Sequence, residues 1–199
     1  MNSIELKQPQ RIVFGTGCMK QMCEEYIASG MKNLCILTAD PILPLVQPVI
    51  CRLEEEGVRT MVETKILGEP TVGDFKRILK EAQDFGADSV IGIGGGSPID
   101  AAKAMWIKYE YPEITFEEMC VVFGIPELRQ KARFIAIPST SGTATEVTAF
   151  SVITDYEKGI KYPLADFGAH ATAGVTNFYN CMILCCSQRN TNNASALGK

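Results

Sequence analysis

The chain has 199 residues, of which 46% are hydrophobic and 21% charged, and its formal net charge at pH 7 is −4. This balance gives no positive field that would gather nucleic acid or an anionic membrane surface, and no apolar run approaches bilayer length. The N-terminus lacks the basic-then-apolar order of a signal peptide. We therefore expect a cytoplasmic globular protein with neither a nucleic-acid partner nor a membrane partner.

Short β-rich runs alternate with amphipathic segments along the chain. Strands are predicted at 11–15, 33–40, 58–64, 89–94 and 134–138, helices over 43–57, over 71–86 and from Ser97 onward, and a hairpin over 150–165. This alternation predicts an α/β fold with a mostly parallel, Rossmann-like sheet, helices on both of its faces and an added β-hairpin.

The composition changes after residue 166. All 23 acidic residues lie at or before Asp166, and from residue 168 onward only Arg189 and Lys199 are charged. We therefore expect an α/β domain over residues 1–167 and a tail over 168–199 that is irregular or partly disordered. A shifted reading frame would produce such a tail, and the coding DNA past codon 167 would test that hypothesis. The eight cysteines contain no CxxC pair and are expected to be reduced and mostly structural.

The segment IGIGGGSPIDAAKAMW (91–106) joins a predicted strand to a predicted helix through three consecutive glycines. Unpaired backbone N–H groups at such a helix start, together with the helix dipole, form a pocket for an anion. Ser97 is expected at the N-cap, Pro98 at the first helical position and Asp100 at the third. The segment matches neither GxGxxG nor a P-loop in full, so a phosphate site and a purely structural turn both remain open.

Five hydroxyl side chains precede Glu146 in PSTSGTATEVT (138–148), which follows the predicted strand at 134–138. In open α/β sheets, ligands bind at the carboxyl ends of the strands, where these hydroxyls can bond phosphate or ribose. Alternatively, Thr143 and Glu146 begin a capped helix. Asp40, at the end of the run ILTAD, either binds ribose hydroxyls or forms a turn.

Four ordered segments resemble those of the iron-containing (type III) alcohol dehydrogenase family. GGGSPIDAAKA is similar to the family signature GGGSxxDxAK, PSTSGTATEVT to its hydroxyl-rich segment, VITDYEKGIKYPLAD to the hairpin that follows, and GEPT to the turn after its third strand. The resemblance runs from about residue 4 to 167, the N-terminal half of a typical member. It implies a nucleotide-binding α/β domain for an enzyme that moves a hydride between a primary alcohol or aldehyde and NAD(P). The all-helical metal domain of the family is expected to be missing here.

The resemblance gives roles to the residues of the glycine-rich segment. It implies that Gly95, Gly96 and Ser97 line the pyrophosphate of NAD or NADP. Asp100 is then expected to brace the start of that helix, because a bare carboxylate beside phosphates would repel them.

The hydroxyl-rich segment and the hairpin supply the other cofactor-binding residues that the resemblance implies. Thr140, Ser141 and Thr143 would hold the ribose–phosphate or nicotinamide side, and Lys161 would reach the cofactor from the hairpin. Asp40 would favour NAD over NADP, because a 2′-phosphate would face its carboxylate.

Family members bind Fe2+, or sometimes Zn2+, through one Asp and three His of the second domain, and the metal polarises the alcohol oxygen. This sequence holds one histidine, His170, and no aspartate after Asp166. We therefore expect no metal ligand and no catalytic residue in this chain. Cys181, Cys185 and Cys186 form a poor metal frame because further partners are missing.

Three interpretations of the function remain open. The chain is the cofactor-binding half of an alcohol or aldehyde oxidoreductase, a non-catalytic nucleotide-binding module, or an orphaned, truncated half-protein that folds poorly. By itself it is expected to be inactive with small alcohols and aldehydes. Apolar surface left without the second domain would favour a homo-oligomer or other self-association.

Overall fold

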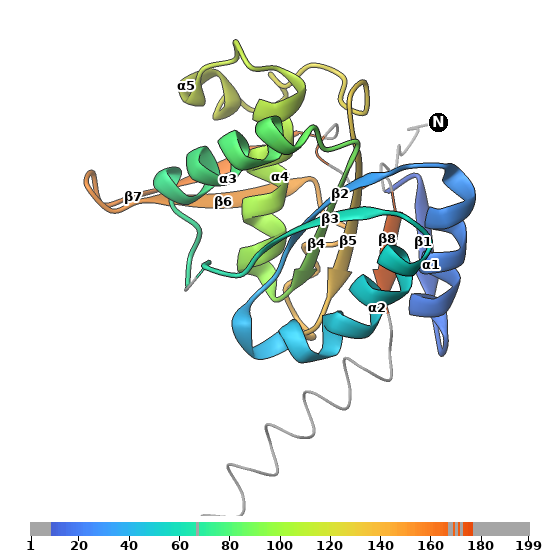
Figure 1. The fold of residues 1–199 in the computed structure, drawn as a ribbon. Helices are drawn as coiled ribbons and strands as arrows, with labels where there is room; N and C mark the ends of the chain where they lie inside the picture. Colours follow the sequence, from blue (N-terminus) through green and yellow to red (C-terminus); the bar gives the residue numbers. More distant parts are fainter. Residues whose placement is uncertain (1–8, 67, 167–168, 170, 172, 177–199) are drawn as a thin grey trace, which may run out of the picture.

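The computed structural model describes residues 9–66, 68–166, 169, 171 and 173–176 (Figure 1). The interpretations of His170, Cys181, Cys185 and Cys186 lie outside these residues. The described strands are β1 (Arg11–Phe14), β2 (Asn33–Leu37), β3 (Arg59–Glu63), β4 (Ser89–Gly94), β5 (Arg133–Pro138), β6 (Phe150–Asp155), β7 (Ile160–Ala165) and β8 (Ala173–Thr176). The described helices are α1 (Cys18–Ser29), the 3-10 helix η1 (Asp40–Ile42), α2 (Leu43–Glu55), α3 (Val72–Phe85), α4 (Gly96–Glu110) and α5 (Phe116–Met119).

Six of these strands form one sheet in the order β1-β8-β5-β4-β2-β3, and the described pairs within it are all parallel. Every residue of β4 is buried. A strand that is covered on both faces carries apolar residues on both, which explains why SVIGIG and FIAIP are nearly continuous apolar runs. The predicted, mostly parallel sheet is confirmed.

Helices cover both faces of this sheet (Figure 1). On one face, α3 and α4 bury a cluster that includes Ile78, Trp106 and Phe134. On the other face, α1 and α2 bury a cluster that includes Tyr26 and Ile50. Alternate residues of β2 and β5 enter opposite clusters, as the two-residue period of a strand requires. The prediction of helices on both faces is therefore confirmed.

Strands β6 and β7 form a separate antiparallel hairpin, in which Asp155 pairs with Ile160 beside the turn. Figure 1 shows the strands of the hairpin crossing α4. Ser151 Oγ on β6 donates a 2.8 Å hydrogen bond to the carbonyl oxygen of Asp100 on α4. The predicted hairpin is confirmed, and its fixed position beside α4 brings its residues close to the start of that helix.

Strand β8 pairs with both β1 and β5 inside the sheet. Residues 173–176, which were expected to belong to an irregular tail, are therefore a strand of the sheet. The four-residue run AGVT is too short to signal a strand by its pattern, and its pairing depends on two distant strands. The division of the chain at residue 167 stays a prediction, and residues 177–199 lie outside the described part.

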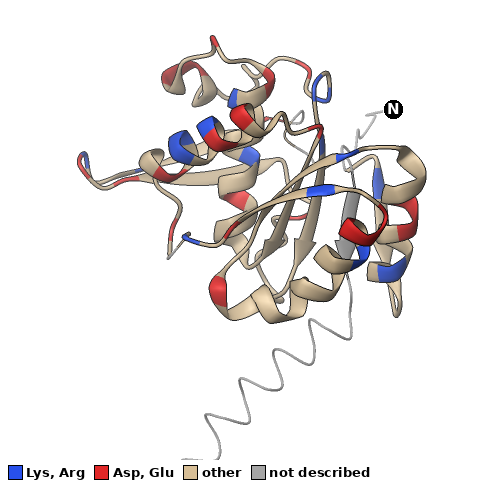
Figure 2. Cartoon of the chain, in the orientation of Figure 1, with Lys and Arg blue, Asp and Glu red and all other residues tan. Residues whose placement is uncertain are grey.

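Charged residues of both signs are distributed over the described structure. Figure 2 shows acidic and basic residues mixed along α3, while β4 carries none. In the part of the chain that the structure describes, no helix combines the length and the apolar composition that a bilayer span requires.

Candidate functional site

Two loops begin side by side at the carboxyl edge of the sheet. We call residues 94–97 the glycine turn and residues 139–149 the hydroxyl loop. They follow β4 and β5, which are parallel neighbours with Gly94 paired to Pro138. The backbone N–H of Ser139 donates a 2.7 Å hydrogen bond to the carbonyl oxygen of Gly94. Parallel strands end at a common edge, so strand pairing brings these two polar loops together.

The glycines leave room between the two loops that other residues would fill. A Cβ on Gly96 would lie 3.4 Å from Thr143 Cγ2, and a Cβ on Gly95 would lie 3.7 Å from Thr140 Oγ1. Gly94 has a φ of 148°, which side-chain-bearing residues rarely adopt, and a Cβ there would meet the Pro98 ring at 3.0 Å. The chain can therefore turn sharply here and leave its backbone exposed to a ligand.

Helix α4 begins within the glycine turn without a side-chain cap. Its N-cap is Gly95, so the prediction of Ser97 as the N-cap is wrong. The first turn of α4 also contains no acidic residue. Because the first N–H groups of a helix have no partner within the helix, this start offers several donors and a positive dipole end to an anion.

The hydroxyl loop contains turns rather than the helix that Thr143 and Glu146 would have capped. The N–H groups of Val147 and Thr148 both bond the carbonyl oxygen of Ala144, which has a positive φ of 52°. A residue in the left-handed region ends a helical turn, so the segment cannot continue as a helix. The alternative of a second capped helix is therefore wrong.

A cavity of about 240 Å³ opens where the glycine turn, the hydroxyl loop and the hairpin meet. Its lining consists of Glu69, Pro70, Gly96, Ser97, Asp100, Thr143, Val152 and Thr154. Four of the nine residues predicted for cofactor binding thus line one cavity. Gly95 and Thr140 adjoin it through the close approach described above, and Ser141 is exposed in the same loop.

Asp100 fixes the loop and the hairpin to α4. Its carboxylate accepts hydrogen bonds from Thr145 Oγ1 at 2.6 Å and from the backbone N–H of Val152 at 3.2 Å. Burial raises the pKa of Asp100, and these two hydrogen bonds and Lys103 oppose the rise. The carboxylate that was expected to brace the start of its own helix is thus engaged with two segments about fifty residues further along the chain.

Lys103 is the main residue that the sequence reasoning missed. Its side chain is fully buried, and its Nζ donates to the carbonyl oxygens of Thr145, Thr148 and Phe150 at 2.6, 2.7 and 2.8 Å. Burial lowers the pKa of Lys103 to about 8. The available signal was a lysine one helical turn after Asp100 within an otherwise apolar run, which places the two charges on one helix face.

Asp40 lies at the same edge of the sheet, in η1 directly after β2. Strand β2 is the neighbour of β4, and Ile42 of η1 would lie 3.3 Å from a Cβ on Gly94. The Asp40 side chain is exposed. The structure therefore brings Asp40 to the glycine turn from the side opposite to the hydroxyl loop.

Lys161 does not line the cavity, but it is paired with Glu69, which does. Its Nζ forms an ion pair with Glu69, whose other carboxylate oxygen accepts a 3.0 Å hydrogen bond from Thr154 Oγ1. The hydrogen bond from Lys161 lowers the pKa of Glu69. A ligand that binds Lys161 here must compete with, or join, this ion pair.

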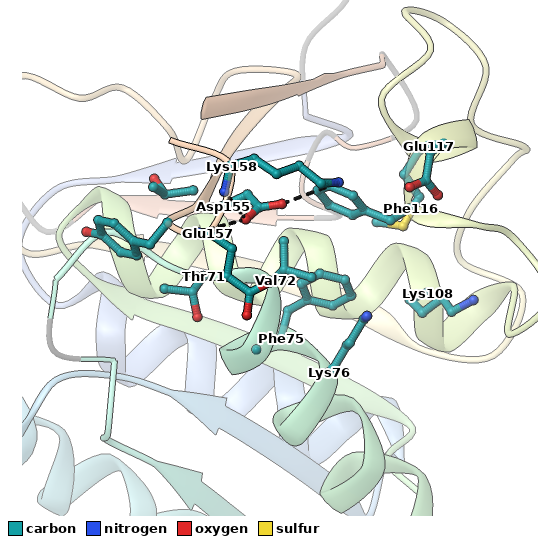
Figure 3. Close-up of a pocket in the computed structure, with 14 residues that line it drawn as sticks. Thr71, Val72, Phe75, Lys76, Lys108, Phe116, Glu117, Asp155, Glu157 and Lys158 are labelled. Carbon is teal, nitrogen blue, oxygen red and sulfur yellow. Dashed lines mark hydrogen bonds and ion pairs between the residues drawn. The ribbon is translucent and has the colours of Figure 1, made fainter. Parts of the chain in front are cut away.

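A larger cavity of about 740 Å³ lies between α3, α5 and the turn of the hairpin (Figure 3). Its charged lining contains three lysines and three acids: Lys76, Lys108, Lys158, Glu117, Asp155 and Glu157. Phe75 and Phe116 stack at its floor with ring centroids 5.7 Å apart. None of the predicted cofactor residues lines it, and its balanced charges select no ligand class, so the smaller cavity is the candidate site.

Among the described residues, no group of three or more His, Cys, Asp or Glu could hold a metal ion. The described residues therefore do not fit a metal centre, and the absence of metal ligands from the whole chain stays a prediction.

The six-stranded parallel sheet, the helices on its two faces and the separate hairpin define an α/β domain of a known class. The chain belongs to the iron-containing alcohol dehydrogenase family, whose model, described as "Iron-containing alcohol dehydrogenase", matches residues 9–175. The resemblance read from the four sequence segments is thereby confirmed.

Two curated relatives make the comparison more specific. The NADPH-dependent butanol dehydrogenase of Clostridium saccharobutylicum is 47% identical over 161 residues, which cover 80% of this chain and 41% of the relative. The bifunctional aldehyde-alcohol dehydrogenase AdhE of Escherichia coli (strain K12) is 37% identical over 177 residues, which cover 83% of this chain and 20% of the relative. The chain thus spans less than half the length of these relatives.

Solved structures agree on the fold. The alcohol dehydrogenase from Oenococcus oeni superposes with a TM-score of 0.83 at 22% identity, over 91% of this chain and 48% of that chain. The iron-containing alcohol dehydrogenase from Thermococcus thioreducens superposes with a TM-score of 0.76 at 27% identity, over 86% of this chain and 46% of that chain. The predicted correspondence to the N-terminal half of the family fold is confirmed.

Proposed function

We propose that this chain is the dinucleotide-binding half of an NAD(P)-dependent oxidoreductase that acts on a small alcohol or aldehyde. The observation that carries the proposal is the uncapped start of α4 facing the hydroxyl loop across one cavity. Family membership supplies the reaction class, since relatives are named butanol dehydrogenase and aldehyde-alcohol dehydrogenase.

The residues present fit a dinucleotide. The N–H groups of Gly95, Gly96 and Ser97 would bind the pyrophosphate at the helix start, where no side-chain oxygen competes as a cap. The Thr140 hydroxyl and the Thr143 side chain approach the same turn. The hydroxyls of both residues would bond the adjoining ribose or phosphate oxygens. Ser141 would complete this set from the exposed part of the loop.

Two charged residues would bear on which dinucleotide binds. Asp40, exposed beside the glycine turn, would accept hydrogen bonds from ribose hydroxyls and repel a 2′-phosphate, which favours NAD. Lys161 would contact the cofactor from its place beside Glu69. Because one relative is named as NADPH-dependent, both dinucleotides belong in the test.

The bound nicotinamide would supply the hydride acceptor or donor. The described residues contribute binding and orientation of that cofactor, and they offer no metal group that could activate an alcohol. We propose that residues 1–167 form the dinucleotide-binding domain and that activation of the substrate depends on residues outside the described part.

Isothermal titration calorimetry with NAD and with NADP tests the proposal, alongside a thermal melt followed by circular dichroism. The matched pair of variants is Gly96→Val, in the first turn of α4, and Gly73→Val, in the first turn of α3. We expect binding by the wild type and by Gly73→Val, and binding at least about tenfold weaker by Gly96→Val because its side chain enters the cavity. A cooperative melt without binding of either dinucleotide would overturn the proposal.

A further inference from the structure

We propose that Lys103 is a positioning residue that holds the hydroxyl loop against the glycine turn, so that the dinucleotide site exists before the ligand arrives. This inference rests on the proposed function above, and it gives a role to a buried charge that cofactor contacts do not require. Lys103 does not line the cavity, so it would act through the loop.

The bonding of Lys103 is complete and directed at a single segment. An ammonium group has three N–H donors and accepts nothing. The three carbonyl oxygens of Thr145, Thr148 and Phe150 lie 2.6 to 2.8 Å from Nζ, so every donor has a partner. Two of these carbonyls belong to the hydroxyl loop and the third belongs to the first residue of β6, so Lys103 fixes the last five residues of the loop and the start of β6.

The same helix carries both halves of the proposed site. The start of α4 offers N–H donors at Gly96, and two turns further along, Lys103 binds the loop that carries Thr143. Asp100, between them, binds the Thr145 hydroxyl while Lys103 binds the Thr145 carbonyl. A single rigid helix therefore sets the distance between the donors for the pyrophosphate and the hydroxyls opposite them.

The surroundings of Lys103 support a fixed charge at this place. The Asp100 carboxylate on α4 and the Glu146 carboxylate in the loop both favour its ammonium form. Glu146 Oε2 is buried as well. An unpaired buried ammonium would be very unfavourable. The charge of Lys103 is therefore stable in this position only while the carbonyl oxygens accept its hydrogen bonds. When Lys103 is removed, three carbonyl groups that are buried or partly buried lose their partner and the loop gains freedom.

The test compares Lys103→Met with Lys108→Met. Lys108 lies on the same helix and also donates to backbone carbonyls, among them Pro112 O at 2.6 Å, but it lines the other cavity. Hydrogen–deuterium exchange of residues 139–150 is measured at pH 7, free and with saturating NAD, and NAD affinity is measured by calorimetry. Exchange in β4 and β5 reports whether the core is disturbed.

For Lys103→Met we expect exchange in the hydroxyl loop to rise at least about tenfold, with β4 and β5 unchanged, and NAD affinity to fall at least about tenfold. Saturating NAD should restore the protection of the loop. Unchanged exchange in β4 and β5 distinguishes this local loosening from a general loss of core stability, which would raise exchange in those strands as well. Lys108→Met should match the wild type in both measurements. Lys103→Arg, which keeps a charge and several donors, should recover part of the affinity.

Unchanged exchange in the loop of Lys103→Met, or unchanged NAD affinity in a wild type that binds, would overturn the inference. If Lys103→Met does not fold, Lys103→Gln and Lys103→Arg carry the same comparison, because they retain two or more N–H donors. If the folded wild type binds no dinucleotide, the proposed function fails, and the exchange of the loop alone decides whether Lys103 orders it.

Discussion

Thr145 Oγ1 donates a 2.6 Å hydrogen bond to Asp100 Oδ1, although the two residues are 45 positions apart in the chain. The other carboxylate oxygen of Asp100 accepts from the backbone N–H of Val152 on the hairpin. One half-buried side chain thus ties α4, the hydroxyl loop and β6 together, next to the cavity proposed for the dinucleotide.

This arrangement predicts the effect of Asp100→Asn. An amide can still accept from Thr145, but its NH2 group would face the N–H of Val152 and leave that donor unpaired. We expect the free energy of unfolding to fall by about 1–3 kcal/mol, measured by urea denaturation. Asp84→Asn, at an exposed position on α3, is the control and should change it by less than about 0.5 kcal/mol. Equal effects of the two changes would contradict this account.

Glu110 at the end of α4 provides a second stability prediction. Its buried carboxylate accepts hydrogen bonds from three successive backbone N–H groups at residues 130–132, at 2.8 to 3.0 Å. Glu110→Gln replaces one acceptor oxygen by a donor, so we expect the free energy of unfolding to fall by about 2–3 kcal/mol. The fluorescence of Trp106, the sole tryptophan of the chain, reports unfolding. The control is Glu113→Gln, at an exposed position, which should leave the free energy of unfolding unchanged. A decrease in the free energy of unfolding as large as that of Glu110→Gln would refute the role of the hydrogen bonds.

The pH dependence of stability tests the buried charge of Lys103. Burial lowers its pKa from 10.5 to about 8, while the Asp100 and Glu146 carboxylates oppose the change. In the unfolded chain the lysine keeps its proton up to its ordinary pKa, so between these two values the unfolded state binds more protons. A state that binds more protons is disfavoured as pH rises, and the folded state therefore gains stability over this range.

We expect the free energy of unfolding of the wild type, minus that of Lys103→Met, to increase from about pH 8 to pH 10. The increase is at most about 1.4 kcal/mol per pH unit, the limit for one proton. Urea denaturation of both proteins at several pH values gives this difference, in which all other titrating groups cancel. A difference that stays flat, or that decreases with pH, would show that the pKa of Lys103 is not lowered by folding.

Asp40→Asn tests the proposed preference for NAD. Without the negative charge, a 2′-phosphate no longer faces a carboxylate, so NADP affinity should rise relative to NAD affinity by about tenfold. Calorimetric titration of both dinucleotides into both proteins measures the ratio. An unchanged ratio would mean that Asp40 lies away from the ribose, and binding of NADP in preference to NAD by the wild type would reject the preference itself.

This chain by itself should not oxidise alcohols. Among the described residues no group of three or more candidate ligands could hold a metal ion, and the chain spans less than half the length of its curated relatives. With Fe2+, NAD and a small primary alcohol, we expect no NADH absorbance above a control without protein. Turnover that depends on the protein and on Fe2+ would show that the prediction is wrong.

The local pattern was sufficient to predict the elements near the site but not all of their ends. The apolar runs before Gly94 and Pro138 predicted two strands, and the polar loops after them predicted a ligand edge. The cap at Ser97 was predicted wrongly because residue type alone favours serine there, whereas the N-cap lies two residues earlier, at Gly95. Strand β8 was not predicted, because its short sequence gains its conformation by pairing between β1 and β5.

The amino-acid sequence by itself determined the α/β class, the glycine turn, the hydroxyl loop and the likeness to one family, because these depend on residue type and spacing along the chain. Only the tertiary structure decided that β4 and β5 are neighbours and that Asp100 and Lys103 bind a loop more than forty residues away. The physical reason is that buried charges take whichever donors and acceptors the packing brings to them. Those partners come from segments whose meeting is set by the whole sheet and its helices.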